Sequence, residues 1–142
     1  MGPNGPEPDM TRMLSGQPEN LKMGSPPTLP TGQWAAAFSS TNTAFAGPWG
    51  VSYTANLTPD PDTGLGNWTE EMFIQALRTG KHMGVSRPIL PPMPWPWYAE
   101  FTDEDLKAIY AYLRTIPAIK NQVPNPEPPV EPVKPKVKSL KK

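Results

Sequence analysis

The sequence contains no cysteine and only one histidine, His82. The absence of cysteine excludes disulfide bonds, thiolate metal sites and a cysteine nucleophile among these residues. A serine nucleophile needs a histidine base, and a chain with one histidine and no glycine-rich phosphate loop offers no plausible hydrolase site. The formal net charge is +0, so no global field draws the chain towards nucleic acid or acidic membranes. We therefore expect neither a hydrolase nor a nucleic-acid-binding protein.

Long apolar runs are also missing. No window approaches the roughly 18 apolar residues of a membrane span, and the first residues lack the basic and apolar regions of a signal peptide. Hydrophobic residues make up 37% of the chain, below the share of about 45–50% that is typical of globular proteins. This composition predicts a small core and leaves membrane association open.

Proline and glycine, in contrast, are abundant, with 22 prolines and 11 glycines. Such a composition predicts long irregular segments. We divide the chain into an irregular loop segment at residues 1–49, a central part at 50–123 and a Pro/Lys-rich tail at 124–142. The apolar residues of 32–53 follow no regular period, so a short strand or a turn of helix is possible there. The prolines of the tail predict an extended, polyproline-like conformation.

Two helices are predicted in the central part, at about residues 69–79 and 102–115. Thr69 and Thr102 each precede acidic residues, which is the pattern of a capped helix N-terminus. Apolar residues four positions apart then continue along one face of each segment. Gly80 is expected to end the first helix.

The segment between these helices, Arg87-Pro-Ile-Leu-Pro-Pro-Met-Pro-Trp-Pro-Trp-Tyr98, holds Met93 between prolines and large apolar residues. Proline fixes φ and removes backbone donors, so this loop should be stiff, and a thioether is a soft ligand that suits haem iron or copper(I). Two other interpretations remain open: Met93 fills an irregular gap in the core, which the residues alone favour, or the prolines form a ligand for a recognition domain. His82 follows the end of the first helix and is expected to be solvated rather than metal-bound.

Five motifs between Gly50 and Pro124 carry a family resemblance. They are Tyr53-Thr-Ala-Asn-Leu-Thr-Pro-Asp60, Thr63-Gly-Leu-Gly-Asn-Trp-Thr-Glu70, Leu77-Arg-Thr-Gly-Lys81, Pro91-Pro-Met-Pro-Trp95 and Thr102-Asp-Glu-Asp-Leu-Lys-Ala-Ile-Tyr-Ala-Tyr-Leu-Arg114. Together they resemble the C-terminal two-thirds of a bacterial class I c-type cytochrome domain. The resemblance implies a mainly α, cytochrome c-like fold that is truncated at its N-terminus, with long irregular Pro/Gly-rich loops and an extended C-terminal tail.

The resemblance also implies a role for each of several residues. Met93 matches the methionine that serves as the distal axial ligand of the haem iron, so it is the expected metal ligand. The implied cofactor is haem c, and the implied function is one-electron transfer without substrate chemistry, so the chain is expected to be an electron carrier and not an enzyme. The residues expected to form the apolar wall of the haem site are Leu90, Pro92, Trp95, Tyr53 and Trp68.

One part of the family pattern is missing, namely Cys-x-x-Cys-His, whose thiols attach the haem and whose histidine is the proximal ligand. These residues therefore cannot attach haem covalently. Residues 1–16 look like the stretch that follows the haem motif, which leads us to expect a truncated reading frame. His82 lies between the first helix and Met93, and it could not readily reach the opposite haem face.

The resemblance implies export to the periplasm, with dehydrogenases or oxidases as redox partners. Two alternatives remain open from the sequence. One is a haem-free, Pro-rich interaction module, and the other is a non-functional fragment whose small core does not offset its conformational entropy.

Overall fold

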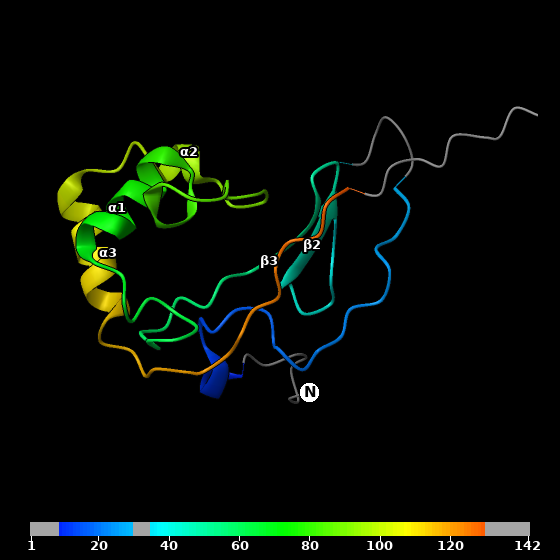
Figure 1. Cartoon of the computed structure of the whole chain (residues 1–142), viewed down its shortest axis with the longest axis horizontal. Coiled ribbons are helices and arrows are strands. Elements are labelled where there is room, and N and C mark those ends of the chain that lie inside the picture. Colours follow the sequence, from blue (N-terminus) through cyan, green and yellow to red (C-terminus); the bar gives the residue numbers. More distant parts are fainter. Residues whose placement is uncertain (1–8, 30–34, 130–142) are drawn as a thin grey trace, which may run out of the picture.

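The computed structural model describes residues 9–29 and 35–129. Expectations about residues 1–8 and about the tail from 130 onwards lie outside the described residues. Helices gather in one half of the molecule and a small sheet lies in the other half (Figure 1). The elements of the described residues are η1 (Met10–Arg12), β1 (Ala37–Phe38), β2 (Ala44–Gly47), β3 (Gly50–Tyr53), α1 (Glu70–Thr79), η2 (His82–Gly84), α2 (Trp95–Tyr98) and α3 (Asp103–Leu113).

The expected mainly α fold is wrong, because the described residues also form an antiparallel sheet in the order β1-β2-β3. Strands β2 and β3 are joined by a turn of two residues. Gly47 and Gly50, on either side of this turn, are paired in the register. The sheet gains a further partner from far along the chain, because the amide and carbonyl of Val51 both bond to Glu127 at 2.9 Å. Alanine and glycine are poor strand formers, so this pairing depends on tertiary contacts that local sequence does not reveal.

The two capped helices are confirmed. Thr69 Oγ1 accepts a hydrogen bond from the amide of Met72 at 3.2 Å, and Thr102 Oγ1 accepts one from the amide of Asp105 at 3.1 Å. Gly80 follows α1 in the left-handed conformation, with φ 64°, as a helix-ending glycine should. Helix α3 ends at Leu113, slightly before the predicted residue 115.

The hydrophobic core lies in the helical half. It joins α1 and α3 to the loop that precedes α1, and the partly buried Trp68 and Tyr110 pack against it. No helix of the described part of the chain is long and apolar enough to cross a membrane. The buried core residues are Leu65, Phe73, Leu77, Leu106 and Leu113.

Outside this core, buried polar side chains hold the irregular segments together. Asn121 is 1% exposed, and its amide nitrogen donates to the carbonyls of Ser15 and Gln17 at 2.7 and 2.8 Å. Asn56 likewise donates to the carbonyl of Ile119 at 2.8 Å. Within residues 9–29 and 35–129, every buried side-chain nitrogen and oxygen has a hydrogen-bond partner. Segments that lack regular structure are therefore fixed by side-chain hydrogen bonds.

Candidate functional site

The candidate site centres on Met93, in the segment from Leu90 to Pro94, which we call the methionine loop. Met93 is 39% exposed, so the residue is not sealed inside the core. A side chain that fills a gap in the core would be buried, and this exposure contradicts the core-filling interpretation. The amide of Met93 donates to the carbonyl of Leu90 at 3.3 Å, which closes a turn directly before α2.

The methionine loop is fixed from the helical half by Gly80. The Gly80 carbonyl accepts a hydrogen bond from the amide of Ile89 at 2.8 Å, and the Trp95 ring lies against the Gly80 Cα. A Cβ at position 80 would stand 2.2 Å from the indole, a distance that no side chain tolerates. Only glycine therefore allows Trp95 to pack on the end of α1 directly behind the loop.

The loop is also fixed from the sheet. The hydroxyl of Ser52, in the middle of β3, donates a hydrogen bond to the carbonyl of Pro91. Trp49, in the turn between β2 and β3, donates from its indole nitrogen to the same hydroxyl at 3.2 Å. Sequence analysis missed both residues, because no local pattern signals a contact between positions so far apart in the chain.

Of the five expected wall residues, four lie in or near the helical half. Trp68 is half-buried against the core, and its carbonyl accepts a hydrogen bond from the Tyr110 hydroxyl at 2.6 Å. Trp95 and Leu90 are half-buried, whereas Pro92 is exposed. The structure thus brings Leu90, Pro92 and Trp95 together with Met93 on one short segment.

The fifth wall residue, Tyr53, lies elsewhere. Adjacent strand residues point to opposite faces, so Tyr53 is directed away from the face on which Ser52 meets the methionine loop. Its hydroxyl donates to the Glu127 carboxylate at 2.5 Å, and its ring lines a pocket beside the sheet with Met23. Burial, followed by the hydrogen bond to Glu127, raises the pKa of Tyr53 to about 12. Tyr53 therefore anchors the C-terminal segment to the sheet.

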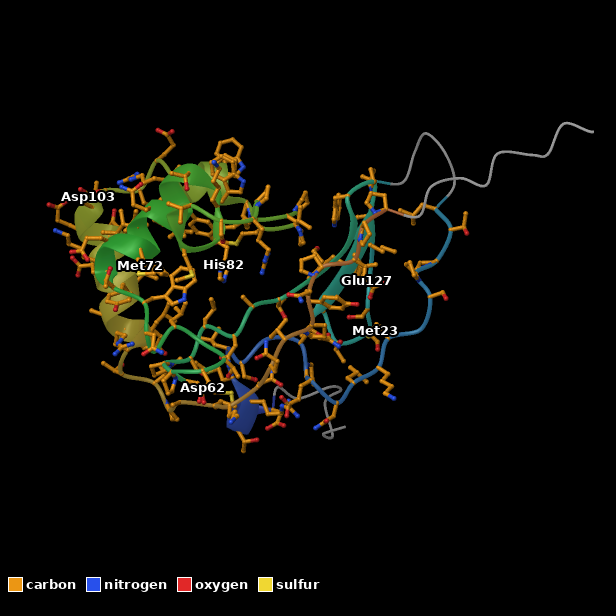
Figure 2. All side chains as sticks on the ribbon, in the orientation of Figure 1. Met23, Asp62, Met72, His82, Asp103 and Glu127 are labelled. Atoms are coloured by element: carbon orange, nitrogen blue, oxygen red, sulfur yellow. The ribbon has the colours of Figure 1, made fainter. Side chains whose placement is uncertain are left out.

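His82 is less exposed than expected. It is half-buried in η2, and its ring meets the Trp68 ring edge-on at a centroid distance of 5.0 Å. Burial, together with the nearby Arg87 charge, lowers the pKa of His82 below its ordinary value. Figure 2 shows His82 on the side of the helical half that faces the sheet. The imidazole thus lies against an aromatic ring in surroundings that disfavour its charged form.

The donor groups of the described residues fit one side of a haem and not the other. An accessible thioether on a stiff apolar loop is suited to one axial position of iron. No group of three histidine, cysteine or acidic side chains that could hold a metal ion occurs in the described part of the chain. Since the whole sequence has no cysteine, the thioether bonds of haem c have no donor here.

Comparison with known proteins supports the family resemblance. No family model matches the chain. The chain is 39% identical over 89 residues to the fructose dehydrogenase cytochrome subunit of Gluconobacter japonicus. This match covers 58% of this chain and 18% of that protein. It is 43% identical over 65 residues to the cytochrome c subunit of the quinone-type alcohol dehydrogenase of Gluconobacter oxydans, which covers 46% of this chain and 13% of that protein.

A third relative is the diheme cytochrome c-type protein of Cereibacter sphaeroides, with 35% identity over 69 residues, 49% of this chain and 23% of that protein. The chain thus spans less than a quarter of the length of each of these three relatives. Their names, two cytochrome subunits and a diheme cytochrome c-type protein, agree with the family resemblance. This chain is therefore similar to cytochrome subunits of dehydrogenases and to a diheme cytochrome c-type protein.

Proposed function

We propose that this chain is the methionine side of a haem c electron-transfer domain, with Met93 as the distal axial ligand. The observation that carries the proposal is the partly exposed Met93 on a proline-rich loop, in a chain that is similar to cytochrome c subunits. When bound, the haem iron supplies a reversible one-electron change. The residues of this chain would bind the haem, orient it and shield it from water.

The role of each loop residue follows from its chemistry. A thioether is a neutral, soft ligand that favours ferrous iron and raises the reduction potential. Prolines 91, 92 and 94 hold the backbone stiff, so the sulfur keeps its place when the iron changes its charge. In this proposal Leu90, Trp95 and Trp68 would form the apolar wall that excludes water from a bound haem, which would lower the local dielectric and also favour the reduced state. Tyr53 has no part in this wall.

The proximal side, with its Cys-x-x-Cys-His motif, is supplied in this proposal by residues outside the given sequence. The related proteins are named as cytochrome subunits of dehydrogenases, and we propose a dehydrogenase as the electron donor. We also propose a periplasmic location, in line with haem c attachment. An oxidase as electron acceptor stays a prediction.

A haem peptide that carries its own Cys-x-x-Cys-His tests the proposal, because it provides covalent haem and the proximal histidine. Titrated into the full chain, it should acquire methionine as sixth ligand. The signs are the weak charge-transfer absorption of methionine-bound ferric haem and a rise in reduction potential. Met93→Leu should abolish both signs.

Met23→Leu is the matched control, since Met23 is 40% exposed and lies beside the sheet (Figure 2). It should leave both signs unchanged. Equal loss in the two variants, or no methionine coordination by the unmodified chain, would refute ligation by Met93. The second result would favour the interaction module, for which Trp97, 76% exposed directly after Pro96, offers a contact surface.

A further inference from the structure

We propose that Ser52 is a positioning residue for Met93, because its hydroxyl ties the carbonyl of Pro91, and with it the methionine loop, to the sheet. The inference rests on the proposed function, since it concerns how the same sulfur is held. Ser52 touches neither the haem nor the sulfur in this proposal. It acts through the backbone of the loop.

The geometry assigns the hydroxyl proton to Pro91. Ser52 is buried, and its oxygen already accepts a hydrogen bond from the Trp49 indole nitrogen at 3.2 Å. A serine hydroxyl has one proton to donate. Two carbonyls lie near it, and the contact to Pro91 is much shorter than the 3.5 Å contact to Phe45. The proton therefore goes to Pro91.

The composition of the methionine loop explains why such an external tether matters. Prolines 91, 92 and 94 have no N–H, so the loop has few backbone donors with which to bond to the rest of the molecule. The amide of Met93 is used within the loop, on the carbonyl of Leu90. The contact with the sheet is made through a loop carbonyl, that of Pro91, and Ser52 supplies the donor.

Two supports then hold the loop from opposite sides. Trp95, packed on Gly80, fixes its C-terminal end on the helical half. Ser52 fixes Pro91, two residues before Met93, on the sheet. The loop bridges the two halves of the molecule, and Met93 lies between the two supports along the chain. Loss of one support should leave the sulfur free to move relative to an iron that needs it at a fixed distance.

The first experiment compares Ser52→Ala and Ser52→Thr in the full chain, titrated with the same haem peptide. Loss of one neutral hydrogen bond should lower the equilibrium constant for methionine ligation about fivefold in Ser52→Ala. Ser52→Thr keeps the hydroxyl and should stay within about twofold. Ser15→Ala is the matched control, because Ser15 is also buried and donates to a carbonyl, that of Arg12 at 2.8 Å, far from the loop.

The second experiment needs no haem. In the chain labelled at its methionine methyl groups, Ser52→Ala should shift and broaden the Met93 resonance and leave the Met23 resonance unchanged. This readout separates the two proposals, because it reports on the loop even where the unmodified chain fails to ligate the haem peptide. A Met93 resonance that is unchanged in Ser52→Ala would overturn the positioning role. So would Ser52→Ala ligation equal to that of the unmodified chain.

Thermal unfolding followed by circular dichroism shows whether each variant is folded. Should Ser52→Ala not fold, Ser52→Cys carries the same test, because it preserves the size of the side chain with a much weaker donor. A loss of methionine ligation in Ser52→Cys and its retention in Ser52→Thr would support the proposal. Equal ligation in both would overturn it.

Discussion

Replacing Asn121 by alanine should cause one of the largest losses of stability available to a single substitution in this chain. Its side chain donates to Ser15 and Gln17 and accepts from the amide of Glu19 at 2.9 Å. A fourth hydrogen bond, from the Arg12 guanidinium at 3.3 Å, is long and is left out of the sum. Each neutral hydrogen bond contributes about 1 kcal/mol, so the three short ones amount to roughly 3 kcal/mol.

That loss is large against a total stability of about 5–15 kcal/mol for a domain. For a chain of this size it corresponds to a fall of about 10 °C in Tm. The site is buried, so the carbonyls and the amide that lose Asn121 as a partner could not readily bond to bulk water instead. The loss of stability should therefore be at least as large as this estimate. Urea unfolding followed by tryptophan fluorescence measures the change.

Asn67→Ala is the control for this prediction. Asn67 is exposed and donates once, to the carbonyl of Pro61 at 2.8 Å, so its loss should cost less than about 1 kcal/mol. If the free energies of unfolding of Asn121→Ala and Asn67→Ala differ by less than about 0.5 kcal/mol, the buried polar network does not hold the segments as argued. Broad, uncooperative unfolding of the unmodified chain would instead favour the non-functional fragment.

Two further predictions concern residues beside the methionine loop. Gly80→Ala should lower the free energy of unfolding by about 3 kcal/mol, because alanine would have to adopt a left-handed φ and its Cβ would collide with Trp95. The control is Gly24→Ala, which has no atom within 4 Å of the added Cβ and should change the free energy of unfolding by less than about 0.5 kcal/mol in the same urea titration. Equal losses in the two variants would contradict the packing argument. The folded-state pKa of His82 lies below 6.5, so the unfolded chain binds the proton more readily and stability should fall as the pH drops below about 6.5. His82→Gln should flatten this dependence, and an NMR titration placing the folded pKa at or above 6.5 would refute the direction.

The methionine loop shows how much of the site could be predicted. The proposal of Met93 as a ligand comes from its prolines and from the family motifs, and Leu90, Pro92 and Trp95 are close to it in sequence, so the chain itself keeps them together. Tyr53 was placed in the same wall because it belongs to a matching motif. Its direction, however, depends on the alternation of β3, and the sequence of residues 32–53 left open whether a short strand or a turn of helix forms there. Sequence neighbourhood is thus a good guide to the loop and a poor guide to what surrounds it.

Local sequence determined the two capped helices, since a cap, its acidic first turn and a terminal glycine act within a few residues of one another. It also determined that irregular, proline-rich segments make up much of the chain. Tertiary structure alone decided the sheet, the buried network around Asn121 and the contact of Ser52 with Pro91. The Asn121 network, the Ser52 contact and the pairing of Val51 with Glu127 join positions far apart in the chain, through hydrogen bonds that any polar residue or peptide group could make. Such bonds have no local signature, because their partners are chosen only when the core brings the segments together.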